Sequence, residues 1–330
     1  MKTYVILGGG GWLGIQVSRY LLTSSPLVRL IGVGRNPERP APFALHRGID
    51  DSRYEYHQIH LVHQPDRLHS LLEAKRPEVI VNLAAHAEES ASWTSSWRYF
   101  EMNTSALARA AEPLLGVSWL RKWIQIGSAS VYGAGSQAAT ESFPLRPATP
   151  YAVSKAAADL YLLSVATMRG FPINIIRPAN VYGPGQQLHR IIPKATLCAL
   201  LGRPLPLQGG GTARKFFLHA EDLSRAIHMA AETGQAGRVY NLGPAEAITI
   251  RTLVETICRK LGKPFEQVVQ LAPDRGGQDT QVTLDSSRIA ADLGWNQTVD
   301  LDKGLDDTIA WIKQHVDVLK TIPTDFTFQA

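Results

Sequence analysis

Residues 4–14 read YVILGGGGWLG, an apolar run that ends in a cluster of glycines. The apolar start predicts a buried strand, and the amphipathic stretch Leu13–Leu22 predicts a helix directly after the glycines. Gly8, Gly11 and Gly14 have the spacing G-x-x-G-x-x-G. Such glycines let the backbone turn tightly and approach a pyrophosphate, and the helix N-terminus offers free N–H groups to an anion. The stretch therefore predicts a strand–turn–helix unit that binds a dinucleotide.

Strand and helix patterns alternate through the first half of the chain, and this is typical of a doubly wound parallel sheet. The other strand candidates are Arg29–Val33, Tyr54–Ile59, Val79–Leu83, Lys122–Ile126 and Ile173–Arg177. The other helix candidates are Arg67–Ala74 and Asn103–Leu114, with two more near Asp222–Glu232 and Ile250–Leu261. The pattern loosens after about residue 180. We therefore predict a Rossmann-type domain over residues 1–178, to which some later segments return, and a smaller mixed α/β substrate domain over residues 179–330.

Composition bounds the possible partners. The 330 residues are 45% hydrophobic and 19% charged, as in an ordinary globular protein. The net charge of +5 suits an anionic small molecule, and because no run of five Lys or Arg occurs, we expect no nucleic-acid partner. Neither a signal peptide nor an 18-residue apolar run is found, so we expect no membrane association. The two cysteines, Cys198 and Cys258, are far apart, which favours reduced thiols in a cytoplasmic protein.

The end of the second predicted strand bears on the choice of dinucleotide. The segment Ile31–Asn36 has no acid at the strand end and carries Arg35 there. A carboxylate at this place would hydrogen-bond the ribose hydroxyls of NAD, whereas an Arg accommodates the 2′-phosphate of NADP. The residues therefore favour NADP over NAD and leave NAD open.

A second group of residues indicates proton and hydride chemistry. Tyr151 and Lys155 are four residues apart at the start of a predicted helix, so they share one face. A free Tyr, with a pKa of about 10, is a poor base at neutral pH. A neighbouring ammonium and a positively charged nicotinamide would favour the tyrosinate. Ser128 follows a predicted strand and is placed to orient a substrate oxygen. We predict Ser128, Tyr151 and Lys155 as the catalytic centre.

With these motifs in order, nearly the whole chain resembles the extended short-chain dehydrogenase/reductases, specifically the nucleotide-sugar epimerase/dehydratase family. The resemblance implies a nucleotide-diphosphate-sugar substrate bound by residues 179–330. It implies cofactor contacts from Gly8, Gly11, Trp12, Leu13, Gly14, Arg35, Leu83, Ala84, Ala85, Asn103, Tyr151, Lys155 and Pro178. It implies substrate contacts from Ser128, Ser130, Asn180, Arg214 and Arg275. Packing is an equal alternative for Trp12.

One departure from the family pattern bears on the reaction. The 4,6-dehydratases of this family carry an acid pair, or at least a Glu, just after the catalytic Ser or Thr, and here those positions are Ala129 and Ser130. The pattern is more similar to UDP-galactose 4-epimerase, so we favour a 4-epimerase. A dehydratase-like enzyme stays open, because residues 274–279 resemble the dehydratases and His86, Glu88 or Glu89 could supply an acid.

Two other activities also remain as alternatives. An NADPH-dependent reductase of a 4-keto-sugar would use the same three catalytic residues. A protein that only senses the cofactor would typically lack the Tyr/Lys pair, so Tyr151 and Lys155 argue against it.

Metal binding and assembly complete the expectations. His57, His60 and His63 lie three residues apart across a strand end, where such spacing alternates faces, so we expect no metal site. The stretches Ser95–Leu114 and Tyr151–Met168 resemble the helix pair through which family members form dimers, which implies a homodimer.

Overall fold

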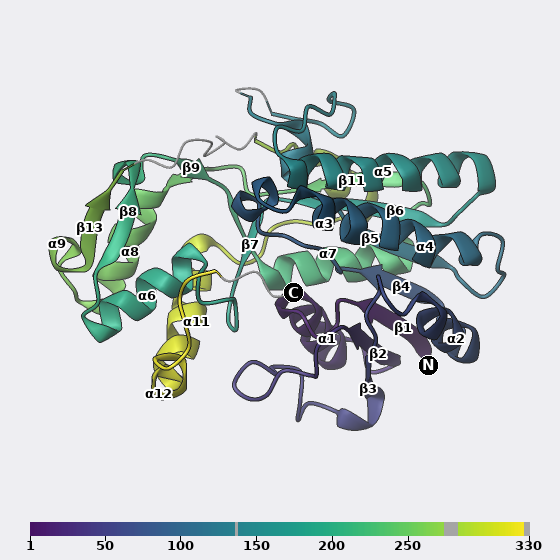
Figure 1. Cartoon of the computed structure of the whole chain (residues 1–330), viewed down its shortest axis with the longest axis horizontal. Helices are drawn as coiled ribbons and strands as arrows, with labels where there is room; N and C mark the ends of the chain where they lie inside the picture. The colour runs from purple at the N-terminus through teal and green to yellow at the C-terminus, as the bar shows by residue number, and fades with distance from the viewer. Residues whose placement is uncertain (136–137, 274–282, 327–330) are drawn as a thin grey trace.

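The computed structural model describes residues 1–135, 138–273 and 283–326, and its centre is one parallel sheet (Figure 1). The sheet has seven strands in the order β11-β6-β5-β4-β1-β2-β3. Its strands are β1 (Lys2–Leu7), β2 (Val28–Gly34), β3 (Tyr54–Gln58), β4 (Val79–Asn82), β5 (Lys122–Ile126), β6 (Ile173–Pro178) and β11 (Arg238–Leu242). The order reverses between β1 and β4, and in open parallel sheets ligands bind at such a switch point, beyond the carboxyl ends of the strands.

Helices cover both faces of this sheet, and each face has its own apolar core. One face packs on α2 (Pro65–Lys75), α4 (Leu107–Ala111) and α5 (Pro150–Arg169), through residues such as Leu72, Ala110 and Leu162. The other face packs on α1 (Trp12–Ser24), α7 (Ala220–Thr233) and α10 (Ser287–Leu293). The fold is therefore the predicted Rossmann-type doubly wound sheet, with β11 and α7 returning from beyond residue 178.

A second, smaller body of structure is built from short strands and helices of the later half. Three two-stranded sheets pair β7 (Asn180–Tyr182) with β10 (Phe217–His219), β8 (Leu205–Gln208) with β13 (Val269–Ala272), and β9 (Arg214–Lys215) with β12 (Ile248–Thr249). The helices here are α6 (Ile191–Leu201), α8 (Ile250–Leu261), α9 (Phe265–Val268), α11 (Leu301–Gln314) and α12 (Val316–Leu319). Residues such as Ile192, Leu253 and Leu305 form a core of their own. The predicted division into domains of residues 1–178 and 179–330 stays a prediction.

Short helical turns join the main elements. They are η1 (Asp51–Arg53), η2 (Ser90–Trp93), η4 (Glu112–Leu114), η5 (Ala129–Tyr132) and η6 (Gly209–Gly211). The predicted helix Asn103–Leu114 begins earlier, with α3 (Ser96–Phe100), and continues through a π-helical stretch, η3 (Glu101–Ala106), into α4. Sequence periodicity places this helix but misses its start and its wide turn.

Three further findings concern metals, membranes and cysteines. Within the described ranges, no three His, Cys, Asp or Glu side chains are grouped as a metal would need. The His60 and His63 rings stack at 4.2 Å, while His57 lies 3.8 Å from Glu55. No helix in these ranges is long and apolar enough to span a bilayer. Cys198 and Cys258 are free and buried.

Candidate active site

The glycine turn lies at the carboxyl end of β1, next to the end of β4. Gly8 has a φ of +87°, and a Cβ there would lie 2.9 Å from the backbone N of Ala84. At Gly14 a Cβ would lie 2.3 Å from the carbonyl oxygen of Gly8, so only Gly lets α1 start this close to the turn. Gly11 is the N-cap of α1 and contributes no side chain, which leaves the first N–H groups of the helix uncovered by a cap. The turn thus fits the pyrophosphate of a dinucleotide.

The first residues of α1 contact the second half of the chain. Trp12 is buried, and its indole N–H donates to the carbonyl of Pro184 at 2.8 Å. Leu13 packs against the core on the α1 face of the sheet. The Trp12 side chain therefore packs between the two parts of the chain, and its contact with a cofactor stays a prediction.

The predicted cofactor residues after β4 are tied to their neighbours. Leu83 donates its N–H to Leu7 at 2.8 Å, and Ala84 donates to the side chain of Asn82 at 3.1 Å. Asn103 is buried and binds both backbone groups of His86, at 2.9 and 3.1 Å, and the hydroxyl of Ser154 at 3.0 Å. The loop after β4, which includes Ala85, is thereby fixed against the helix that carries Tyr151 and Lys155.

Arg35 follows β2 immediately and is half-buried. Its positive charge helps to lower the pKa of His60 and the pKa of His86, although burial is the larger cause for both rings. His60 comes after β3 and His86 after β4, so the Arg35 charge acts on groups at the carboxyl edge of the sheet. This is where a dinucleotide would lie. Pro178, the last residue of β6, is buried and pairs with Leu242 of β11.

The catalytic helix α5 begins with a capped turn that brings Tyr151 beside Ser128. The Thr149 hydroxyl accepts from the N–H of Ala152 at 3.1 Å, and Pro150 occupies the first helical position. Ser128 ends the approach from β5 and caps η5, accepting from the N–H of Ser130 at 3.1 Å. Ser128 also lowers the pKa of Tyr151 through its hydroxyl. Two of the three predicted catalytic residues are therefore neighbours.

The pKa of Tyr151 is set by its surroundings. Burial raises it to about 12, and the Ser128 hydroxyl opposes this. Glu89 raises the pKa of Tyr151 further and Arg190 lowers it. Burial is the largest of these effects of the polypeptide. The lowering of the Tyr151 pKa that the sequence predicts therefore has to come from the positive charge of a bound cofactor.

Lys155 lies one helical turn beyond Tyr151 and is buried. Its ammonium donates to the carbonyl of Ile126, at the end of β5. Burial lowers the pKa of Lys155 to about 8, and the Asp159 carboxylate opposes this lowering. The ammonium therefore lies next to the sheet edge and is half-deprotonated near pH 8.

A buried polar network continues from Asp159. Arg177 of β6 donates from Nε to Oδ2 of Asp159 at 2.8 Å and from Nη1 to the Tyr132 hydroxyl at 2.7 Å. Tyr132 in turn donates to Asn241 of β11 at 2.7 Å. A Cβ at Gly127 would lie 3.0 Å from the Arg177 side chain, so the strand end before Ser128 rests on this network. Sequence reasoning missed it; the spacing of Asp159 four residues after Lys155 is the signal that was available.

The loop after β4 brings two carboxylates to the site, and they have different partners. Glu89 accepts from the Thr149 hydroxyl at 2.9 Å and from the Ser130 hydroxyl at 3.4 Å. Glu88 instead lies 3.1 Å from Arg190 and 3.3 Å from His189. Burial alone would raise the pKa of Glu88, but the His189 hydrogen bond and the Arg190 charge outweigh it and lower the pKa.

The predicted substrate residues are spread along the later half of the chain. Ser130 lies in η5, beside the catalytic residues. Asn180 begins β7 and donates from its side chain to Phe216 at 3.2 Å. Arg214 is exposed in β9 and donates to Ala247 at 3.1 Å. Arg275 lies outside the described residues. Ser130 thus joins the catalytic group, whereas Asn180 and Arg214 bind Phe216 and Ala247.

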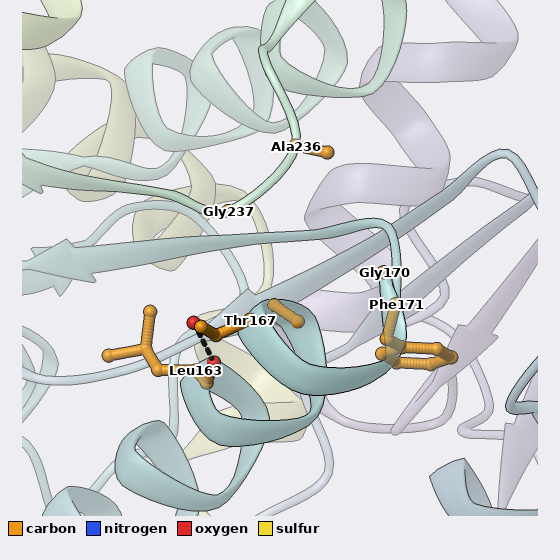
Figure 2. Close-up of a pocket in the computed structure, with 7 residues that line it drawn as sticks. Leu163, Thr167, Gly170, Phe171, Ala236 and Gly237 are labelled. Carbon is orange, nitrogen blue, oxygen red and sulfur yellow. Dashed lines mark hydrogen bonds between the residues drawn. The ribbon is translucent and has the colours of Figure 1, made fainter.

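A hollow elsewhere on the molecule is separate from this site. Figure 2 shows it at the far end of α5, where Thr167 donates to the Leu163 carbonyl at 2.9 Å. Its volume is about 260 Å³, and Phe171, Ala236 and Gly237 also line it. Because Thr167 lies 16 residues beyond Tyr151, the two are about 24 Å apart along the helix. The hollow has no part in the catalytic group.

The comparison with known proteins agrees with the fold and the motifs. The chain belongs to the NAD dependent epimerase/dehydratase family, which it matches over residues 4–243. This confirms the predicted resemblance to the nucleotide-sugar epimerase/dehydratase family of the extended short-chain dehydrogenase/reductases.

Among relatives, a dTDP-glucose 4,6-dehydratase of Streptomyces griseus is 31% identical and covers 96% of this chain and 95% of its own length. The chain spans about half of some longer relatives: it covers 47% of a trifunctional UDP-glucose 4,6-dehydratase/epimerase/reductase of Arabidopsis thaliana at 25% identity.

Solved structures show the same arrangement. A dTDP-glucose 4,6-dehydratase of Streptomyces venezuelae, solved with NAD, has a TM-score of 0.88 at 26% identity, covering 96% of this chain and 98% of that one. A UDP-glucuronic acid 4-epimerase of Bacillus cereus, solved with UDP-glucuronic acid and NAD, has a TM-score of 0.84 at 26% identity, covering 94% and 99%. Both dehydratases and epimerases are therefore among the structural neighbours.

Proposed function

We propose that this protein oxidises C4 of a nucleotide sugar and returns the hydride to the other face of the same carbon, as a 4-epimerase. The observation that carries the proposal is that α5 brings Tyr151 and Lys155 to the end of β5, near Ser128, with Ala129 and Ser130 in place of acids. Epimerisation through a 4-keto-sugar needs one group to take and return the C4 hydroxyl proton, and it needs no second acid.

Each residue of the site has a defined part in this reaction. Ser128 would hold the C4 oxygen by a hydrogen bond, Tyr151 would take its proton, and Lys155 would hold the cofactor, whose positive charge favours the tyrosinate. A bound nicotinamide supplies the hydride acceptor. For return of the hydride, Tyr151 gives the proton back to the C4 oxygen after the sugar has presented its other face.

The cofactor is proposed to be a nicotinamide adenine dinucleotide held at the glycine turn. The neighbours named above were solved with NAD, which supports NAD. Arg35 at the end of β2 supports room for a 2′-phosphate and hence NADP. We propose Arg35 as the residue that decides between them.

A 4,6-dehydratase is the second candidate, and Glu89 is the observation in its favour. Its carboxylate contacts Ser130, at one of the positions where dehydratases of the family carry an acid. The 31% identity to a dTDP-glucose 4,6-dehydratase points the same way. In that reaction Glu89 would take the C5 proton and protonate the C6 hydroxyl, which leaves as water; the hydride from C4 would then go to C6, and a proton would return to C5.

Mass spectrometry of the products distinguishes these candidates. Purified protein with NAD or NADP is incubated with matched UDP-, dTDP-, GDP-, CDP- and ADP-sugars. An unchanged mass with a shifted chromatographic peak supports the epimerase. A product lighter by one water overturns it in favour of the dehydratase. Turnover only of a 4-keto-sugar with NADPH would instead show a reductase.

We also propose a cytoplasmic homodimer. Large apolar side chains are exposed on α3 and α5, which pack against each other: Trp97 (62% exposed), Phe100 (37%), Val153 (38%) and Leu160 (58%). A second copy of this helix pair would cover them. Two free, buried cysteines suit a reducing compartment.

A further inference from the structure

Among the carboxylates around Tyr151, Glu89 differs from the others in its partners. Its carboxylate accepts hydrogen bonds from two hydroxyls, Thr149 at 2.9 Å and Ser130 at 3.4 Å. Within the described ranges, no Lys, Arg or His lies within ion-pair distance of it, in contrast to Glu88 beside it. Hydroxyl donors stabilise a carboxylate without neutralising its charge.

The other titratable groups near Tyr151 are paired or neutral. Arg190 is paired with Glu88 at 3.1 Å, together with His189. Burial lowers the pKa of His86 to about 4, helped by Arg35 and Arg98, so this ring is neutral at pH 7. Arg98 acts on His86 but is not among the charges that shift the pKa of Tyr151.

Below Tyr151, the charged groups belong to the buried network. Lys155 donates to Ile126 and faces Asp159, and Asp159 is paired with Arg177 at 2.8 Å. Glu89 is thus the one carboxylate at this end of α5, in the described part of the chain, whose charge no cation neutralises. Its negative charge reaches the reacting group, because it raises the pKa of Tyr151.

The position of the sugar follows from the chemistry of the site. If Tyr151 takes the C4 proton, the C4 oxygen must lie within hydrogen-bond reach of its hydroxyl. The C6 substituent of a hexose is two bonds from C4, so it too lies close to Tyr151 and within reach of the charge of Glu89. A carboxylate at C6 would be held close to an unneutralised carboxylate, whereas a hydroxymethyl or methyl group would not be repelled.

We propose that Glu89 makes this site selective for nucleotide sugars with an uncharged C6 and excludes nucleotide uronic acids. The inference rests on the proposed function, since it takes C4 to lie at Tyr151, and it holds for an epimerase and for a dehydratase alike. Like charges placed side by side in a partly desolvated site reduce affinity strongly, so we expect at least a tenfold difference.

Calorimetric titration of the cofactor-loaded protein tests the proposal without turnover as the readout. Its ligands are matched pairs of an NDP-glucose and the corresponding NDP-glucuronic acid, with UDP, dTDP, GDP, CDP and ADP as the nucleotide. For the base that binds, wild-type protein should bind the glucose member at least tenfold tighter. In Glu89→Gln the affinity for the uronic acid should rise about tenfold, with the glucose affinity nearly unchanged.

Two further variants separate charge from shape. Glu89→Asp keeps the charge and should keep the discrimination. Glu73→Gln, an exposed position on α2, changes the net charge equally and should change neither affinity. Equal binding of both members by wild-type protein, or an unchanged ratio in Glu89→Gln, would overturn the proposal alone. Absence of binding by every ligand of the set would overturn this proposal, and the product assay above would decide the proposed function by itself.

Discussion

Arg177 donates from Nε to Oδ2 of Asp159 at 2.8 Å, and both side chains are almost fully buried, with 2% and 0% exposed. The pair joins β6 to α5 one turn beyond Lys155. It therefore links the stability of the sheet to the electrostatics of the catalytic helix.

Replacing Asp159 by Asn should destabilise the protein strongly. It leaves the Arg177 guanidinium buried without its counter-charge, which costs about 3–5 kcal/mol in comparable buried pairs. Denaturant unfolding measures this. The matched control is Asp317→Asn, which removes one partner of the exposed pair with Lys320 and should leave stability unchanged. Equal stability of both variants would show that the buried pair is not stabilising.

The same variant should alter the pH dependence of activity. Burial lowers the pKa of Lys155 to about 8, and Asp159 opposes this, so removing the carboxylate lowers the Lys155 pKa further. Because the ammonium exists only below its pKa, the alkaline fall in kcat/KM should begin at lower pH in Asp159→Asn. The dependence of kcat/KM on pH, measured for the folded fraction of the variant, checks this. An alkaline fall at the same pH as in the wild-type protein would contradict the role given to Asp159.

Replacing Tyr151 by Phe should reduce kcat at least a hundredfold and leave cofactor affinity within a few-fold, because the variant loses the proton acceptor and little else. Steady-state kinetics and fluorescence titration with NAD and NADP measure the two effects. Ser164→Ala, an exposed hydroxyl later on α5, serves as the control and should be fully active. Undiminished turnover of Tyr151→Phe would refute the catalytic assignment.

A pair of glycine variants tests the dinucleotide turn. Gly8 and Gly48 have similar φ angles, +87° and +79°, so Ala costs about 1–2 kcal/mol of backbone strain at either. At Gly8 the Cβ would also lie 2.9 Å from the Ala84 backbone, whereas at Gly48 nothing lies within 4 Å. Gly8→Ala should therefore lose cofactor binding and Gly48→Ala should keep it. Equal affinities in the two variants would count against the turn as the cofactor site.

Arg35→Ala should weaken NADP binding about tenfold or more and leave NAD binding nearly unchanged, because a guanidinium contacts the 2′-phosphate that only NADP carries. Fluorescence titration with both cofactors measures this. A parallel loss for both would mean that Arg35 supports the fold of the site, and no loss for either would remove it from the cofactor residues.

Leu160→Glu should convert the proposed dimer into monomers, because it would place a charge in the apolar interface between the α3–α5 pairs of the two copies. The control is Leu27→Glu. Leu27 is 72% exposed, against 58% for Leu160, and lies outside these helices, so this variant should leave the assembly unchanged. Analytical ultracentrifugation gives the result. A monomeric wild-type protein would show that the exposed apolar side chains serve another purpose.

The long elements of the fold could be predicted from the sequence, and the short ones could not. Lys122–Ile126 and Ile250–Leu261 were placed with their observed ends, because buried strands and amphipathic helices leave clear patterns. Strands of two or three residues, such as Arg214–Lys215 and Phe217–His219, are too short to show a period. Their pairing depends on contacts distant in sequence.

The candidate site shows the same limit. Tyr151, Lys155 and Ser128 could be predicted as a catalytic group because fixed spacing and chain order carry the information. That Glu89 and not Glu88 faces Ser130 depends on which of two neighbouring side chains Arg190 and His189 engage. The partner of Trp12, the carbonyl of Pro184, comes from far along the chain, so packing and cofactor contact could not be separated beforehand.

The position of β11 has a consequence for how the protein is made. All six residues of β6 are buried, and β11, which covers its outer edge, lies some sixty residues later in the chain. During synthesis the sheet therefore has an unprotected, apolar edge until residue 242 has emerged. Unpaired edges of this kind invite pairing with other chains. Ribosome-bound or truncated forms that end near residue 178 should accordingly depend on chaperones to avoid aggregation.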